Sequence, residues 1–295
     1  MLHITAVNHV ETNFSEFNFL QHVSPTVQIG HLVMPILITP VAENGSWSGS
    51  TWKVTDEERL AELIARVAIG QARVVERILR ATDDLTPGYP QGGFAGARAL
   101  LIAESGKDPY HRDGWVFQVI AWIAAHQFDQ TALIRAPQMI MADKGLDGLI
   151  IEFDSNGIAQ VVICEEKATE NPRQKVQSSV WPEFENFETG VRDNELVASV
   201  ISLLERSTDP DPDRTVANIL WNDKRGYRVA VTVGDKYATA EGRKRLFKGY
   251  EKKVLGDITR RRAETLHLED VRDWIARIAE KTVAVIDSAE AETNV

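Results

Sequence analysis

Cysteine is nearly absent from this sequence of 295 residues, because Cys164 is the only one. A single cysteine excludes an internal disulfide and any zinc site built from several thiolates. Cys164 lies inside an apolar run, so we interpret it as a buried structural residue and not as a nucleophile.

Long hydrophobic runs are also missing. No stretch of 18 or more apolar residues is present, so the sequence predicts no transmembrane helix. The first residues lack the basic and apolar regions of a secretory signal. With 43% hydrophobic and 26% charged residues, the composition is that of an ordinary globular protein. We therefore expect a cytoplasmic protein that does not contact a membrane.

Positive charge is in deficit overall, with a net charge of −10, but it is concentrated locally. Residues 243–262 contain nine Lys or Arg against two acids. Such a block suits contacts with the phosphates of a nucleic acid, and it equally suits a solvated helix face or a contact for an acidic partner. The candidate nucleic-acid-binding residues are Arg243, Lys244, Arg245, Arg260, Arg261 and Arg262.

The chemistry is concentrated in residues 143–169. Residues 149–151 and 158–164 are apolar and rich in β-branched side chains, which predicts two adjacent strands joined by the turn residues 154–157. Strand side chains alternate between faces, so Glu165 and Lys167 lie on one face and Glu166 points to the other. Asp147, which precedes the first strand, is expected to approach this pair.

Two carboxylates that converge at the end of a buried sheet repel each other unless a cation joins them. Hard oxygen ligands such as Asp147 and Glu165 suit Mg²⁺ or Mn²⁺. Lys167 beside them is suited to positioning or deprotonating a metal-bound water molecule and to offsetting the charge of a phosphate under attack. The alternative is that Glu165 and Lys167 are ordinary surface charges at a strand end and that Asp147 is a turn residue.

The pattern of Asp147 followed by Glu165-Glu166-Lys167 at the end of an apolar strand resembles the signature of the PD-(D/E)XK nuclease superfamily. The resemblance covers about 27 residues, and Leu146 stands where the signature has proline. It implies that Asp147 and Glu165 bind the metal, that Glu166 contributes its main-chain carbonyl, and that Lys167 is the catalytic lysine.

The helices around this stretch suggest further site residues. Asn171-Pro172 is a typical helix start, and some nucleases of this kind place a glutamine in the first turns, which makes Gln174 a catalytic candidate. The segments 95–104 and 115–126 are predicted helices that precede the stretch, and the resemblance makes Glu104 and Gln118 candidates for an additional acid or amide. A structural role is the simpler interpretation of both residues.

Other elements are predicted from periodicity and breaker residues. We expect a long helix from a capping box at Thr55 to about residue 81, and strands over 133–141 and 227–233. Helices are expected from residue 172 to a break or restart at Pro182, over 194–205, and near the C-terminus. Residues 209–213 read as a stiff acidic linker, and residues 289–295 as a frayed end.

The predicted fold class is α/β: a restriction-endonuclease-like core, in which helices flank a mixed β-sheet. The core is expected over residues 95–235, after a strand and helix region in 1–94 and before a basic and helical region in 236–295. The expected function is Mg²⁺- or Mn²⁺-dependent hydrolysis of DNA in restriction or anti-phage defence, as a homodimer or with a partner ATPase or helicase. The alternatives are an inert scaffold or regulatory subunit with the nuclease fold, and a hydrolase of small phosphoesters.

Overall fold

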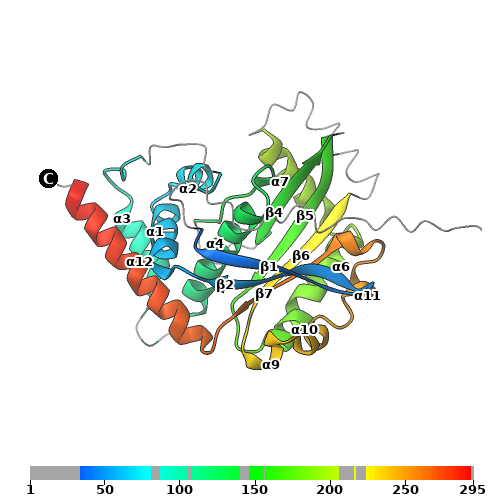
Figure 1. Ribbon diagram of the computed structural model, residues 1–295. Coiled ribbons are helices and arrows are strands. Elements are labelled where there is room, and N and C mark those ends of the chain that lie inside the picture. Colours follow the sequence, from blue (N-terminus) through cyan, green and yellow to red (C-terminus); the bar gives the residue numbers. More distant parts are fainter. Residues whose placement is uncertain are drawn as a thin grey trace, which may run out of the picture. The chain divides into compact units, whose positions relative to one another are not determined.

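A mixed seven-stranded β-sheet organises this computed structural model (Figure 1). The structure describes residues 34–80, 87–139, 146–205, 216 and 224–293, apart from 105, 107 and 156. The strand order is β1-β2-β7-β6-β5-β4-β3. The strands are β1 (Ile36–Glu43), β2 (Trp47–Val54), β3 (Leu133–Ile134), β4 (Gly148–Asp154), β5 (Gly157–Lys167), β6 (Arg225–Val233) and β7 (Arg261–His267).

Strand pairing is parallel in the centre of the sheet and antiparallel toward both edges. The pairs β1–β2, β3–β4 and β4–β5 are antiparallel, whereas β2–β7, β7–β6 and β6–β5 are parallel. A tight turn joins β4 to β5, and Gly157 adopts a φ of +112° there. The predicted pair of adjacent strands and the predicted strand at 227–233 are confirmed. Their β-branched runs suit a sheet that is covered on both faces.

One face of the sheet packs on helices from the middle and later parts of the chain. These are α5 (Pro172–Lys175), the π-helix η1 (Val176–Val180), α6 (Trp181–Glu188), α7 (Asp193–Leu204), α9 (Asp235–Ala238), α10 (Ala240–Leu246) and α11 (Tyr250–Lys253), followed by the 3₁₀ turn η2 (Ile258–Arg260). Phe184 and Tyr250 join Ile163 and Val229 of the strands in one apolar core. Because side chains alternate along β5, Glu165 and Lys167 share this face with Ile163.

The opposite face is covered by α4 (Tyr110–Phe128), and further helices pack on the side of α4 that faces away from the sheet (Figure 1). These are α1 (Glu57–Ala68), α2 (Ala72–Leu79), α3 (Phe94–Leu101) and α12 (Val271–Thr293). Helix α4 is apolar on nearly all sides and is buried from Trp115 to His126, which confirms the sequence prediction of a buried helix.

Several predicted boundaries are wrong for local reasons. The long helix from residue 55 is two helices, because Gly70 adopts a φ of +91° between α1 and α2. Its N-cap is Asp56, whose carboxylate accepts a hydrogen bond from the Arg59 amide. Pro182 does not end the helix that begins at 172; it lies in the first turn of α6, where α-helical geometry restarts directly after the π-helix η1. At the other end of the chain, α12 continues to Thr293, past the start of the predicted frayed segment.

The sheet draws strands from all three predicted segments of the chain. Residues 95–235 supply β3 to β6, while β1 and β2 come from the segment before them and β7 from the segment after them. Strand β3 is shorter than predicted, and residues 140–141 of that prediction lie outside the described residues. The predicted linker at 209–213 also lies outside them. Within the described ranges, no helix has the length and hydrophobicity needed to cross a bilayer.

Candidate active site

The ends of β4 and β5 bring together the three side chains that the sequence singled out. Lys167 lies between the two acids: its Nζ donates to Asp147 Oδ2 and lies 2.8 Å from Glu165 Oε2. Asp147 immediately precedes β4, whereas Glu165 and Lys167 close β5. The expected convergence of two acids and a lysine is therefore present in the structure.

Burial controls the electrostatics of this cluster. Glu165 is 5% exposed, and burial, together with the neighbouring Asp147 carboxylate, raises the pKa of Glu165 to about 7. Burial lowers the pKa of Lys167, but the attraction of Glu165 and Asp147 outweighs burial and raises this pKa above its usual value. Lys167 is therefore a fixed positive charge at neutral pH and not a proton acceptor.

Asp147 is held from two directions, through its main chain and through its carboxylate. Gln118 of α4 donates its Nε2–H to the Asp147 carbonyl, and the amide of Glu166 donates to Asp147 Oδ2 over 3.3 Å. The preceding Leu146 is fully buried in the apolar core. Gln118 therefore contacts the site through the backbone of Asp147. Glu104 lies exposed after the end of α3.

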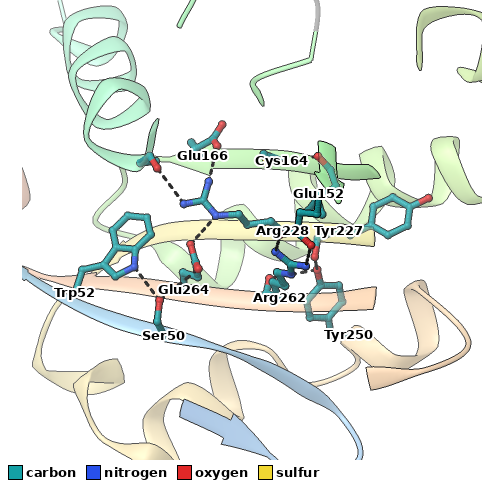
Figure 2. Close-up of polar contacts among 12 residues, drawn as sticks. Ser50, Trp52, Glu152, Cys164, Glu166, Tyr227, Arg228, Tyr250, Arg262 and Glu264 are labelled. Atoms are coloured by element: carbon teal, nitrogen blue, oxygen red, sulfur yellow. Dashed lines mark hydrogen bonds and ion pairs between the residues drawn. The ribbon is translucent and has the colours of Figure 1, made fainter. Parts of the chain in front are cut away.

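The Glu166 carboxylate lies on the opposite face of the sheet, as the alternation predicted. There Glu166 Oε1 is 3.2 Å from Arg228 Nη1, and Arg228 Nε is 2.6 Å from Glu264 Oε2 (Figure 2). Burial raises the pKa of Glu166 to about 8 even though Arg228 lowers it. Cys164 is buried on the same face, which confirms its structural character.

The donor set suits a hard divalent cation only in part. Asp147 and Glu165 supply two carboxylates, and Mg²⁺ commonly binds through one or two carboxylates while it keeps several waters. Across the described part of the chain, no group of three His, Cys, Asp or Glu side chains converges on a metal position. The reason is that the third acid, Glu166, is turned toward Arg228. A metal held here would need Asp147, Glu165 and main-chain or water oxygens.

Gln174 lies at a neighbouring surface cleft and not in the carboxylate cluster. This cleft has a volume of about 750 Å³ and runs between the start of α5 and α9. Its lining includes Gln174, Gln177 and Lys236. Gln174 is exposed, and its catalytic role stays a prediction.

The arginines at the end of the basic block point into the protein. Arg261 is 3% exposed, and its guanidinium donates to the carbonyls of Gly45, Ser46, Val254 and Gly256. Arg260 is buried and bonds Glu188, and Arg262 bonds Glu152. These guanidinium groups bond to carbonyls and carboxylates of the protein itself. The expectation of a phosphate-binding surface at Arg260, Arg261 and Arg262 is therefore wrong.

The first half of the block is more accessible. Lys244 and Arg245 are exposed on α10, and Lys244 lies 2.9 Å from Glu43. Arg243 is partly buried and donates to the Ala238 carbonyl. Two of the six candidate nucleic-acid-binding residues, Lys244 and Arg245, are thus exposed to solvent, and their role in binding stays a prediction.

Sequence reasoning missed Arg228 and Glu264. Arg228 interrupts the mostly apolar run of β6, at the second position after Gly226, and Glu264 lies at the centre of β7 between Ala263 and Thr265. A charged residue inside an apolar strand run is a signal for a buried ion pair, because an isolated buried charge is costly. Their partners, however, become visible only when β5, β6 and β7 are placed side by side.

Comparison of the chain with protein-family models, with curated proteins and with solved structures found no match. The fold class and the geometry of the site therefore have to support any functional conclusion by themselves.

Proposed function

We propose that this protein is a Mg²⁺- or Mn²⁺-dependent nuclease that hydrolyses phosphodiester bonds of DNA. The observation that carries the proposal is the convergence of Asp147, Glu165 and Lys167 at the ends of two central strands. Two acids and a lysine on a sheet with helices on both faces also fit the resemblance to PD-(D/E)XK nucleases. Anti-phage defence or restriction is the biological setting that we propose by analogy alone.

Each residue has a role that follows from its surroundings. Asp147 and Glu165 would hold the metal, and Glu166 would add its main-chain carbonyl. The metal would supply Lewis-acid catalysis and make water a better nucleophile at neutral pH. In the metal-free protein, Glu165 and Asp147 raise the pKa of Lys167, so we assign Lys167 the role of hydrogen bonding to the negative charge that develops on the scissile phosphate. This role differs from that of a general base.

Substrate binding needs more positive surface than the basic block provides. The exposed cations Lys244 and Arg245 and the cleft residue Lys236 are the candidates for phosphate contacts. Because the chain carries a net charge of −10, we propose that a second copy of the chain, or a partner ATPase or helicase, helps to hold the DNA.

A second candidate function is favoured by one observation. Lys167 forms ion pairs with both Asp147 and Glu165, so its positive charge offsets the repulsion between the two carboxylates without a metal. An inert scaffold or regulatory subunit that keeps the nuclease fold would have this arrangement. The two candidates differ in one measurable property, because only the nuclease needs to bind a divalent metal through Asp147 and Glu165.

The test is cleavage of plasmid and single-stranded DNA with Mg²⁺ or Mn²⁺, alongside calorimetric titration of Mn²⁺. We expect the native chain to cut DNA and the Lys167→Ala and Asp147→Ala variants to lose at least 100-fold in rate, as loss of a preorganised charge commonly does. Lys53→Ala, at an exposed lysine of β2, is the control and should cut at the native rate. A native chain that neither cuts DNA nor binds Mn²⁺ would contradict the proposal and favour the scaffold.

A further inference from the structure

A buried polar network lies directly behind the candidate active site, on the face of the sheet covered by α4. Its residues are Glu166, Arg228, Glu264, Ser50 and Trp52, which we call the back-face network (Figure 2). Ser50 donates to Glu264 Oε1 over 3.3 Å, and Trp52 Nε1 donates to Ser50 Oγ over 2.9 Å. The network therefore joins β2, β7, β6 and β5 across the sheet.

Arg228 is the centre of this network. The three nitrogens of its guanidinium contact three different elements: Nη1 contacts Glu166 of β5, Nε contacts Glu264 of β7, and Nη2 donates to the Ala121 carbonyl of α4 over 3.1 Å. Arg228 is 3% exposed and lies 5.4 Å from the centre of the Trp52 ring. Only the planar fork of arginine can make these three contacts at once.

The network is connected to Asp147 by two routes. Through α4, the Ala121 carbonyl that holds Arg228 lies one turn after Gln118, which donates to the Asp147 carbonyl. Through β5, the carboxylate of Glu166 holds Arg228 while its amide donates to Asp147 Oδ2. Arg228, Glu166, Asp147, Gln118 and α4 thus form a closed ring of contacts.

Burial of the charged groups of the back-face network costs free energy. Two carboxylates and one guanidinium have to lose their hydration, and packed apolar side chains of similar volume are often at least as stabilising. One oxygen of Glu166, Oε2, is buried and has no hydrogen-bond partner among the residues that the structure describes. What the ion network adds, and apolar side chains do not, is a directional restraint on the end of β5.

We propose that Arg228 is a positioning residue of the active site. It holds the Glu166 carboxylate on the face of the sheet opposite the candidate active site. The Glu166 amide then orients the Asp147 carboxylate, and the last residues of β5 place Glu165 and Lys167 beside Asp147. This inference rests on the proposed function for its link to metal binding, but the positioning itself is a property of the metal-free protein.

The test compares lysine substitutions at two neighbouring arginines, Arg228 of β6 and Arg262 of β7. Arg228→Lys keeps a positive charge between Glu166 and Glu264 and loses the three-way fork. Arg262→Lys is the matched control, because Arg262 is the register partner of Arg228 on β7 and contacts Glu152 of β4 and Gln160 near the start of β5. Hydrogen exchange of the Glu166 amide is followed by NMR, and Mn²⁺ affinity is measured by calorimetry with the metal alone.

In Arg228→Lys, we expect the Glu166 amide to exchange at least tenfold faster, while the amide of Val162 in the middle of β5 keeps its native rate. Metal affinity should fall at least tenfold, which is common when a group that orients a ligand is removed. In Arg262→Lys, the Glu166 amide and the Mn²⁺ affinity should stay within twofold of the native values.

The exchange experiment decides the positioning role whether or not the metal binds. Native exchange of the Glu166 amide in Arg228→Lys, or equal acceleration at Val162, would overturn the inference. If the native chain binds no Mn²⁺, the proposed nuclease function fails, and faster exchange confined to Glu166 would still establish that Arg228 positions Asp147.

Discussion

Replacement of Glu165 by glutamine should change how the stability of the metal-free protein depends on pH. The folded chain holds the pKa of Glu165 at about 7, because burial and Asp147 disfavour the ionised form. In the unfolded chain this carboxyl has its ordinary pKa of 4.5. Between these two values, the folded state binds more protons than the unfolded state. The free energy of unfolding should therefore fall as the pH rises through this range.

The size of the effect follows from the two pKa values. Each pH unit between them corresponds to about 1.4 kcal/mol, so ionisation of Glu165 should cost the folded state about 3 kcal/mol between pH 5 and pH 8. The stabilising contribution of the neutral form is complete below pH 4.5 and is lost above pH 7. Glu165→Gln cannot ionise, so this part of the pH dependence should disappear in the variant.

The assay is urea unfolding of both proteins at pH 5, 6, 7 and 8 in the presence of EDTA, followed by tryptophan fluorescence. The measured quantity is the difference in free energy of unfolding between native chain and variant at each pH. We expect the native chain to lose about 3 kcal/mol relative to Glu165→Gln over this range. A difference that is constant or that grows in favour of the native chain would refute the reasoning. With Mn²⁺ in place of EDTA, the native chain should be stabilised more at pH 8 than at pH 6, because the metal binds the ionised carboxylate.

Two further predictions concern the framework of the sheet. Arg261→Ala removes the donor to four main-chain carbonyls that are buried or partly buried, and should lower the free energy of unfolding by about 3 kcal/mol. Arg245→Ala on the exposed surface should change it by less than about 0.5 kcal/mol, and equal effects in urea unfolding would contradict the internal role of Arg261. Gly49→Ala should lower it by more than about 4 kcal/mol, since a Cβ there would lie 1.9 Å from the Ala263 carbonyl oxygen between β2 and β7. Gly114→Ala is the control for added volume, because no atom of the described residues outside its own helix backbone lies within 4 Å of that Cβ. A native-like melting temperature for Gly49→Ala would show that the two strands are further apart.

The centre of the candidate site was predictable because it depends on local rules. Strand periodicity placed Glu165 and Lys167 on one face and Glu166 on the other, and the structure has this arrangement. The approach of Asp147 followed from the tight turn between β4 and β5, which brings the start of one strand beside the end of the next. Both inferences need only the pleat of a strand and a short connection.

The basic block shows where local reasoning fails. Nine positive charges in twenty residues indicated a surface for phosphates, but net charge does not say which way a side chain points. Arg261 begins β7, an interior strand of the sheet, and its guanidinium donates hydrogen bonds to carbonyls of the turn before β2. That turn is more than 200 residues away in the sequence, so no window around Arg261 could have indicated its partner.

The sequence by itself determined the mixed α/β class, the strand pair with its alternating faces, and the identity of the two acids and the lysine, because these depend on residues that are close along the chain. The tertiary structure alone decided that β7 enters the sheet between β2 and β6, that the last arginines of the basic block are internal, and that Arg228 joins Glu166 to Glu264. These features arise from contacts between distant segments, and their free energy depends on which strands become neighbours.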